Sequence, residues 1–222
     1  MSIASQLKEI KTKLPTTVKL IAVSKFHSPE AIMKAYNEGH RIFGESKVQE
    51  LVQKKDLLPK DIEWHFIGHL QRNKVKDIVP FISLIHGVDS LRLLREINQR
   101  AREANQVVHC LLQIHIADES SKFGFSFDEC RELLAGEEWK SFENIKIAGV
   151  MGMATFTDDK KKVREEFQSL YRFFKEIKER YFANYHYFKE VSMGMSEDYL
   201  IAIEEGSTLI RIGTALFGER EY

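Results

Sequence analysis

The sequence is poor in cysteine and proline, and this excludes several classes of protein. Of its 222 residues only Cys110 and Cys130 are cysteines, and neither belongs to a CxxC pair or to a cysteine and histidine cluster with zinc-ligand spacing. A disulfide framework is therefore excluded, and reduced thiols, as in the cytoplasm, are expected. With 4 prolines and 12 glycines, the composition is that of an ordinary globular protein.

The chain also lacks an excess of charge of either sign. Lysine and arginine number 33, aspartate and glutamate number 33, and the formal net charge is zero. This argues against a protein that binds nucleic acid or an anionic membrane, although a small local anion site is compatible with it. No apolar run approaches the roughly 18 residues of a membrane span, and the N-terminal stretch MSIASQLKEIKTKL contains no hydrophobic signal segment. We expect a soluble, cytoplasmic protein.

What the chain does contain is eight short apolar runs rich in valine, isoleucine and phenylalanine. These predicted strands cover residues 20–24, 41–43, 64–67, 82–88, 107–116, 145–153, 186–192 and 209–212. Amphipathic patterns between the runs predict helices over residues 29–37, 47–54, 70–78, 91–104, 127–134, 159–182 and 197–204. Ser28, Ser90 and Ser196 precede three of these helices as expected N-terminal caps.

The alternation of strand and helix predicts parallel strands joined by right-handed crossovers. Eight such strands in 222 residues suit a closed (β/α)8 barrel of the TIM type, and a doubly wound open sheet is the alternative. No linker rich in proline, glycine or serine divides the chain. We therefore expect a single α/β domain over residues 1–222.

Glycines and hydroxyl residues collect directly after the last two apolar runs, at the end of the barrel where this fold often binds a phosphate. Ser196, Gly213 and Thr214 would offer hydroxyl groups and approachable backbone N–H groups to such an anion. Spacing alone leaves open whether Ser196 is only a helix cap and Gly213 only a tight turn.

Two cationic side chains lie at the ends of neighbouring strands of the predicted barrel. Lys25 ends the first run, where partial burial would lower the pKa of its amine and leave it nucleophilic toward a carbonyl; a solvated or ion-paired lysine is the alternative. Arg211 closes the last run and could donate to an anion or to a heterocyclic ring nitrogen. An ion pair with Glu45 or Asp89 is the alternative for Arg211.

Motifs for dinucleotides, P-loop phosphates, esterases and zinc proteases are absent. His65 and His69 are four residues apart, but Gly68 and the apolar run between them argue against one helical face. Both are expected to be core or rim histidines, and no metal site is predicted.

Several segments, in order over nearly the whole chain, resemble the pyridoxal phosphate homeostasis protein family. They are AVSK at 22–25, FGE at 43–45 with VQE at 48–50, WHFIG at 64–68 with LQ at 70–71 and NK at 73–74, SMGMS at 192–196, and RIGT at 211–214. The resemblance implies a fold-type III barrel, like the N-terminal domain of alanine racemase, that binds pyridoxal 5'-phosphate (PLP) at its mouth.

The resemblance also implies roles for individual residues. Lys25 would form the internal aldimine with PLP, and Arg211 would face the pyridine nitrogen. The phosphate would be held by Ser196, Gly213 and Thr214, with Ser192 the less favoured serine because it lies inside the strand pattern. Family members commonly read FGEN where this chain reads FGES, so Ser46 would replace only part of a contact made by that amide. The stretch KFGF at 122–125 resembles a loop of the family and is interpreted as a lid or rim element.

These implied roles favour a carrier over an enzyme. Arginine can only donate, so the ring nitrogen would stay unprotonated and the cofactor would be a weak electron sink. The chain ends at Tyr222, soon after the eighth strand, so we expect no counterpart of the additional β-domain of alanine racemases. We expect a monomer that holds PLP as a Schiff base in intracellular PLP homeostasis, without catalytic residues, and with PLP-dependent apoenzymes as candidate partners.

Two other functions are compatible with the same residues. The first is a small PLP-dependent amino-acid racemase, with Lys25 as the base on one face; it needs an acid on the other face, and no tyrosine in the strand-end segments obviously supplies it. The second is a phosphate-binding aldolase-type lyase that uses Lys25 without PLP.

Overall fold

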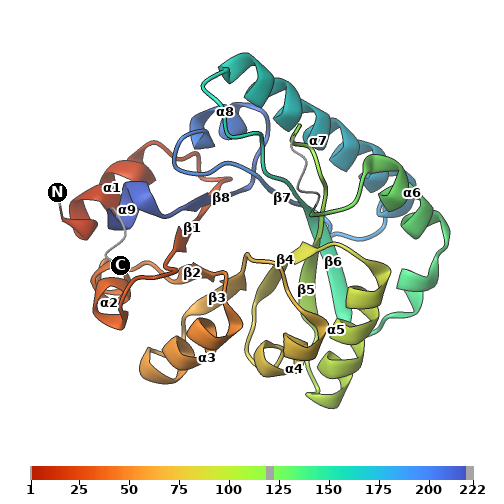
Figure 1. Cartoon of the computed structure of the whole chain (residues 1–222), viewed down its shortest axis with the longest axis horizontal. Coiled ribbons are helices and arrows are strands. Elements are labelled where there is room, and N and C mark those ends of the chain that lie inside the picture. The colour runs from red at the N-terminus through yellow and green to blue at the C-terminus, as the bar shows by residue number, and fades with distance from the viewer. Residues whose placement is uncertain (1, 119–122, 219–222) are drawn as a thin grey trace.

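The computed structural model describes residues 2–118 and 123–218, and in them eight parallel strands close into a barrel in chain order (Figure 1). The strands are β1 (Lys19–Val23), β2 (Ile42–Glu45), β3 (Glu63–Phe66), β4 (Leu84–Val88), β5 (Val108–Gln113), β6 (Ile145–Met151), β7 (Glu190–Ser192) and β8 (Leu209–Ile212). β8 pairs with β1, with Arg211 opposite Ile21, and this pairing closes the ring. The predicted (β/α)8 barrel is confirmed, and the alternative of an open sheet is wrong.

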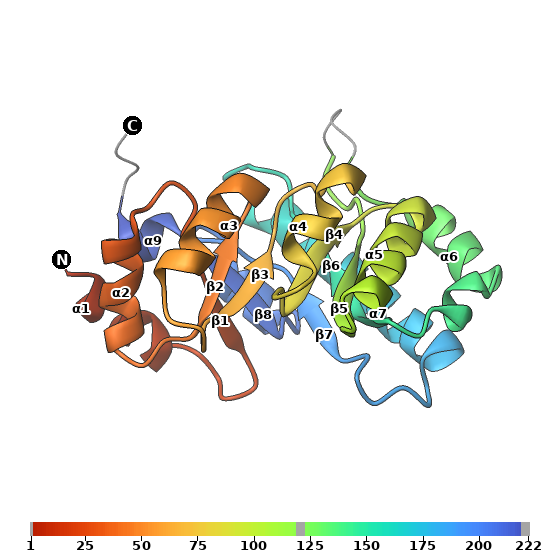
Figure 2. The same ribbon diagram turned by 90° about the horizontal axis from the view of Figure 1, so that it is seen from below.

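Helices connect the strands and form the outer layer of the barrel (Figure 1). They are α1 (Ile3–Thr12), α2 (Pro29–Asn37), α3 (Val48–Leu57), α4 (Val75–Ile78), α5 (Leu91–Glu103), α6 (Phe127–Ala135), α7 (Lys160–Tyr181), α8 (Tyr199–Glu204) and α9 (Thr214–Phe217), with 3-10 turns η1 (Arg72–Lys74) and η2 (Glu138–Ser141). Seen from the side, α3, α4 and α5 stand beside the strands that they connect (Figure 2).

The predicted helices agree with the structure where a serine caps the first turn. The side chains of Ser28 and Ser90 accept hydrogen bonds from the backbone N–H groups of Ala31 and Leu93. The predicted helix over 70–78 is instead the 3-10 turn η1 followed by the short helix α4. The sequence patterns did not indicate α1, η2 or α9.

The prediction that Ser196 caps a helix is wrong. The backbone N–H of Met195 donates to a side-chain oxygen of Asp198, and the N–H of Asp198 donates back to the Met195 carbonyl. This closed turn delays the start of α8 to Tyr199, with Asp198 at its N-cap. Ser196 therefore lies in the turn, where its hydroxyl is available to another element.

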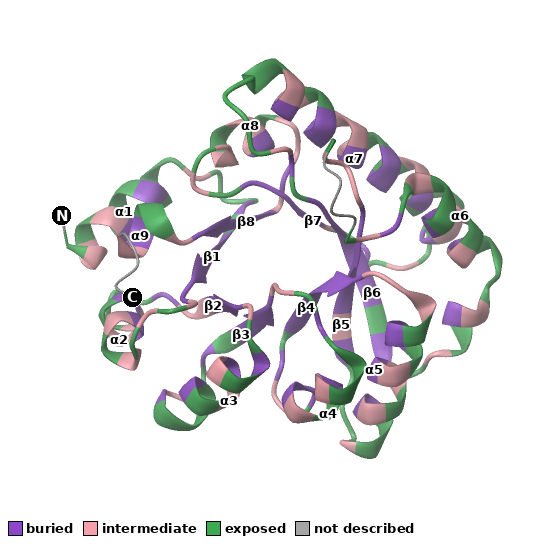
Figure 3. Cartoon of the chain, in the orientation of Figure 1, coloured by how far each residue is buried: buried purple, intermediate pink, exposed green. Residues whose placement is uncertain are grey.

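The core has two layers, one on each side of the strands. The inner cluster contains residues from strands alone, so it fills the barrel lumen; its buried members are Ile21, Leu84, Leu111, Ala148, Met151 and Leu209. The larger outer cluster lies between the strands and the helices and includes Phe43, Trp64 and Phe167. In Figure 3 the strands are buried while the outer faces of the helices are exposed. Because side chains alternate along a strand, this division tells which residues face the lumen.

None of the helices within residues 2–118 and 123–218 is long and apolar enough to cross a lipid bilayer. Cys110 and Cys130 are free, buried thiols. Burial raises the pKa of Cys130 to about 12, so this thiol stays protonated and contributes only apolar packing at neutral pH.

Candidate functional site

Lys25 lies in a tight turn at the C-terminal end of β1. The backbone N–H of His27 donates to the Ser24 carbonyl over 3.0 Å, and the third residue of the turn, Phe26, has a φ of 67°. A positive φ at the third position is the signature of a type II turn. Ile21 of β1 faces the lumen, and Lys25, which is partly buried, follows two residues after the last residue of this strand, at the mouth of the barrel.

A buried ionic network lies on the outer side of this turn, between β2 and α3. The ammonium of Lys54 donates to the Ser24 carbonyl (2.7 Å), to Oε1 of Glu45 (2.7 Å) and to Oε1 of Glu50 (2.6 Å). The Ser24 hydroxyl also donates to Oε1 of Glu45, over 2.7 Å. Glu45 is fully buried and its Oε2 has no hydrogen-bond partner in the described part of the chain. Burial raises the pKa of Glu45 to about 7, against the opposing effect of Lys54.

Arg211 on β8 is a buried cation without an ion pair among the described residues. Its side chain is fixed by Nη1, which donates to the Ser192 hydroxyl over 2.6 Å, and by Nη2, which donates to the Gly152 carbonyl over 3.1 Å. Burial lowers the pKa of Arg211 to about 10, a direction that the charge of Asp198 opposes. The guanidinium remains protonated at neutral pH.

The interpretation of Arg211 as half of an ion pair with Glu45 or Asp89 is wrong. Glu45 pairs with Lys54 at 2.7 Å, and a carboxylate oxygen of Asp89 lies 3.2 Å from Nδ1 of His69. Both carboxylates are thus bound elsewhere. A buried guanidinium with only neutral partners favours an acceptor arriving from outside the chain.

A line of buried polar groups continues from Arg211 through the lumen. Nδ1 of His86 lies 2.9 Å from the Ser192 hydroxyl, and Nε2 of His86 lies 3.1 Å from Nδ1 of His65. Burial lowers the pKa of His65 to about 3 and the pKa of His86 well below its ordinary value. Both rings are therefore neutral at neutral pH.

Arg211 fixes the direction of the first hydrogen bond of this line. Because a guanidinium can only donate, the oxygen of Ser192 is the acceptor toward Arg211. The direction of the contacts from Ser192 to His86 and from His86 to His65 is set by the tautomers of the two rings. The side chain of Arg211 is thus oriented by a chain of neutral groups, each of which has a partner.

The last two strands bring together the residues predicted to bind phosphate. The Ser196 hydroxyl accepts a hydrogen bond from the backbone N–H of Ala215 over 3.4 Å, in the first turn of α9, which begins at Thr214 after Gly213. Gly194 makes the intervening turn possible: its φ is 94°, and a Cβ there would lie 2.6 Å from the Cβ of Ala202. Ser196, Gly213 and Thr214 therefore lie beside one another at the mouth of the barrel.

Ser46 and the stretch 122–125 are the two further elements of the predicted site. Ser46 follows β2 at the same mouth and is partly buried; its carbonyl oxygen would lie 2.3 Å from a Cβ on Gly68, so the ends of β2 and β3 pack closely. In the stretch 122–125, Lys122 lies outside the described residues. Phe125 forms backbone hydrogen bonds with Gln113 and His115, which places this stretch at the rim beside β5.

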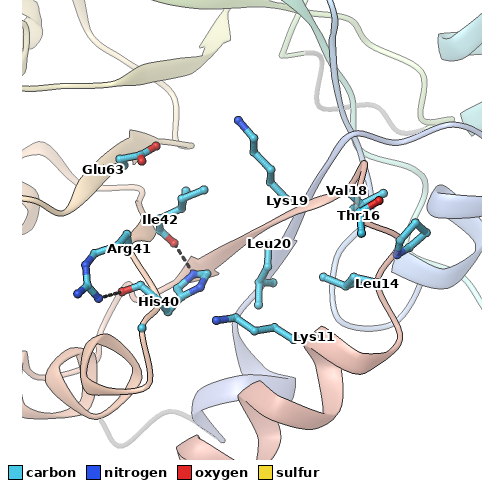
Figure 4. A pocket seen from close by; sticks show the side chains of 12 residues that line it. Lys11, Leu14, Thr16, Val18, Lys19, Leu20, His40, Arg41, Ile42 and Glu63 are labelled. Carbon is cyan, nitrogen blue, oxygen red and sulfur yellow. Dashed lines mark hydrogen bonds between the residues drawn. The ribbon is translucent and has the colours of Figure 1, made fainter.

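Two cavities lie at the opposite end of the barrel, both lined by described residues. One of about 450 Å³ lies near the N-terminal ends of β1 and β2, and Figure 4 shows Lys11, Lys19 and His40 around it. The other, of about 220 Å³, is bordered by His65, His109 and Glu63. TIM barrels carry their chemistry at the C-terminal strand ends, so neither cavity lies at the end of the barrel that carries Lys25 and Arg211.

Comparison with known proteins shows the family. Residues 1–221 match the family model described as alanine racemase, N-terminal domain. The chain is 39% identical over 205 residues to the pyridoxal phosphate homeostasis protein of Aquifex aeolicus strain VF5, covering 92% of this chain and 88% of that protein. The protein of that name from Schizosaccharomyces pombe is 35% identical over 206 residues, covering 91% and 84%. This chain belongs to the pyridoxal phosphate homeostasis protein family.

Solved structures support the family's fold. The PipY protein of Synechococcus elongatus PCC7942, solved without PLP, superposes with a TM-score of 0.92 at 34% identity and covers 98% of this chain and 100% of its own. The same protein with PLP bound gives a TM-score of 0.88. Alanine racemase of Clostridium difficile 630 has a TM-score of 0.78 at 16% identity, with 56% of its chain covered, which shows a shared barrel fold. The predicted fold-type III barrel of the family is confirmed.

Sequence reasoning missed the residues that support Lys25 and Arg211. His86 lies in the middle of an apolar run, and a polar residue at a lumen-facing position was the available signal. Ser192 was discounted as a phosphate ligand, and its hydroxyl in fact contacts Arg211. Lys54 and Glu50 look like an ordinary surface pair four residues apart on a helix, and the burial of Lys54 depends on β1 and β2.

Proposed function

We propose that this protein binds pyridoxal 5'-phosphate as a Schiff base on Lys25 and acts as a PLP carrier in intracellular PLP homeostasis. The observation behind the proposal is Arg211, a buried cation with no ion pair in the described part of the chain, held by Ser192 and Gly152. A ring nitrogen is a neutral acceptor that suits such a donor. The name of the curated relatives and the PLP bound to PipY support the same ligand.

The remaining residues of the mouth would bind the other groups of the cofactor. The hydroxyls of Ser196 and Thr214 and the backbone N–H groups at Gly213 and Thr214 would hold the phosphate, and Ser46 would border the ring from β2. When bound, PLP supplies an aldehyde that reacts reversibly with a primary amine. The chain supplies that amine in Lys25. Its turn is hydrogen-bonded on the outer side to Lys54 and Glu50.

We propose carriage and not turnover because Arg211 can only donate to the ring nitrogen, which leaves the ring a poor acceptor of electrons. The pKa of Arg211, lowered to about 10, still keeps it protonated at neutral pH. No catalytic residue is assigned. We further propose that the protein is a cytoplasmic, single-domain monomer that supplies PLP to dependent apoenzymes.

The test is the visible spectrum of the purified protein after PLP is added, followed by borohydride reduction and peptide mapping. A yellow Schiff base trapped on the Lys25 peptide and lost in Lys25→Ala supports the proposal. Trapping at another lysine, or no visible band, would favour the aldolase-type function. Rapid exchange of the α-proton of L-alanine in deuterated water by the holoprotein would instead favour the racemase.

A further inference from the structure

We propose that Lys54 is a positioning residue, whose ammonium, together with Glu50, clamps the peptide groups on both sides of Lys25 and so directs the Lys25 side chain into the barrel mouth. This inference rests on the proposed role of Lys25 as the residue that bonds to PLP. It adds a specific task for a buried lysine that does not itself meet the cofactor.

The clamp acts on the backbone immediately before and after Lys25. Before it, the carbonyl of Ser24 accepts from Nζ of Lys54 over 2.7 Å. After it, the N–H of Phe26 donates to Oε1 of Glu50 over 2.6 Å, and the same oxygen accepts from Lys54 over 2.6 Å. One ammonium therefore holds one flank directly and the other through a carboxylate.

The hydrogen-bond count shows that Lys54 is fully used in this arrangement. A lysine ammonium has three donors. The three acceptors within 2.7 Å are the Ser24 carbonyl, Glu45 and Glu50. Neutral methionine at this position would leave all three acceptors without that donor, and the guanidinium of arginine has a different, planar geometry.

The turn needs such a clamp because Phe26 adopts a backbone conformation that L-residues avoid. Its φ of 67° falls in the left-handed region, which is unfavourable for a residue other than glycine. The Phe26 side chain is 40% exposed, so burial does not explain the conformation. Two hydrogen bonds hold the turn: the N–H of His27 donates to the Ser24 carbonyl, and the N–H of Phe26 donates to Glu50 and fixes the peptide group that this φ orients.

The network is buried, and this bears on whether Lys54 positions the Lys25 turn or only stabilises the fold. Lys54 is only 5% exposed and Glu45 is fully buried. Buried ion pairs often add little net stability, because desolvation offsets their attraction, and in some proteins they instead fix a conformation. We assign that role to this network, and the conformation is that of the turn containing Lys25. The neighbouring Lys55 makes the comparison possible, since it forms an exposed pair with Asp56 on the same helix.

The experiment compares Lys54→Met with Lys55→Met in the full-length protein. The first readout uses no cofactor: hydrogen exchange of the Phe26 amide. The second is the equilibrium constant for the Schiff base with PLP, from absorbance. Lys54→Met is expected to speed exchange at Phe26 and to weaken Schiff-base formation by roughly tenfold, because the strained turn is no longer held in place. Lys55→Met is expected to change neither.

A rescue variant separates positioning from general damage. Glycine adopts a positive φ without strain, so adding Phe26→Gly to Lys54→Met is expected to restore most of the Schiff-base equilibrium constant. Should Lys54→Met fail to fold, Glu50→Gln takes its place. The amide introduced by that substitution would be neutral toward Lys54, so faster exchange at Phe26 and loss of Schiff base are expected in the same direction and to be smaller.

Two results would overturn the inference. One is unchanged Phe26 exchange and unchanged Schiff-base formation in Lys54→Met and Glu50→Gln. The other is weakened Schiff base that Phe26→Gly does not restore. Failure of the proposed function is a separate outcome, in which borohydride traps no PLP on Lys25 in the unchanged protein while the Phe26 amide still responds to Lys54→Met.

Discussion

Ser192 accepts a hydrogen bond from Arg211 across 2.6 Å inside the barrel lumen. Both side chains are buried, and the serine lies on β7 while the arginine lies on β8. The arginine can only donate, so the Ser192 oxygen accepts from it, and the same hydroxyl contacts His86, which in turn contacts His65. The orientation of the guanidinium therefore depends on Ser192 and, through it, on a histidine 106 positions away in the sequence.

Ser192→Ala is expected to weaken PLP binding without moving the site of attachment from Lys25. The substitution removes the acceptor of one Arg211 N–H and the hydrogen-bond partner of His86 Nδ1, and a buried unsatisfied group is unfavourable by about 1–3 kcal/mol. We expect a loss of roughly tenfold or more in PLP affinity. Absorbance titration with PLP, followed by peptide mapping, measures both effects.

Ser207→Ala is the matched control for that variant. Ser207 is also a buried serine next to β8, and its hydroxyl donates to the Met193 carbonyl over 2.7 Å. Its removal is expected to lower thermal stability by a similar amount and to leave PLP affinity unchanged. Equal losses of affinity in both variants would mean that Ser192 acts only through stability.

The buried histidines predict how stability depends on pH. The pKa of His65 is lowered by burial to about 3, below its ordinary value of 6.5, so the unfolded state binds the proton more readily. The contribution of neutral His65 to the free energy of unfolding is complete above pH 6.5 and is lost as the pH falls toward 3. At pH 5 this amounts to about 2 kcal/mol for one such histidine.

Replacing His65 tests whether the free energy of unfolding falls with pH for this reason. The free energy of unfolding of the unchanged protein should fall by about 2 kcal/mol more than that of His65→Gln between pH 7 and pH 5, as measured by urea titration. Glu45 works in the opposite direction, since burial raises its pKa from 4.5 to about 7, and its effect is common to both proteins. Parallel pH profiles for the two proteins would contradict the assignment of a buried neutral His65.

Gly194→Ala is expected to weaken phosphate binding and to destabilise the fold. Gly194 has a φ of 94°, and an added Cβ would lie 2.6 Å from the Cβ of Ala202, so the turn that presents Ser196 must shift. Gly39 provides the control, because its φ is 78° but a Cβ there meets no atom within 4 Å. Chemical denaturation should show about 1 kcal/mol of loss for Gly39→Ala and more for Gly194→Ala. A PLP titration should detect a loss only for Gly194→Ala.

The barrel could be predicted from the sequence because its signals are local. Apolar runs alternate with amphipathic stretches, so the alternation and the order of elements are visible along the chain. The ends of helices were predicted less accurately where a turn precedes the first helical residue. Asp198, which bonds back to Met195, ends the loop two residues later than the Ser196 cap would.

The supporting residues could not be predicted because their partners are distant in sequence. His86 contacts Ser192 across 106 positions, and Lys54 contacts Ser24 across 30. A lysine in the last turn of an amphipathic helix ordinarily lies in solvent. Only the packing of α3 against the ends of β1 and β2 shows that Lys54 is buried, and only the closed ring shows that His86 and Arg211 share one lumen.

Ser196→Ala separates recognition of the phosphate from attachment of the aldehyde. The Ser196 hydroxyl lies 3.4 Å from the Ala215 N–H, beside Gly213 and Thr214, and away from the Lys25 turn in sequence. Loss of one hydroxyl to a charged group is unfavourable by about 1.5–3 kcal/mol. We therefore expect PLP affinity to fall by roughly tenfold or more, while affinity for pyridoxal, which lacks the phosphate, changes little. Titration of both aldehydes gives this ratio directly, and an equal loss for the two would show that Ser196 acts on the aldehyde end or on the fold.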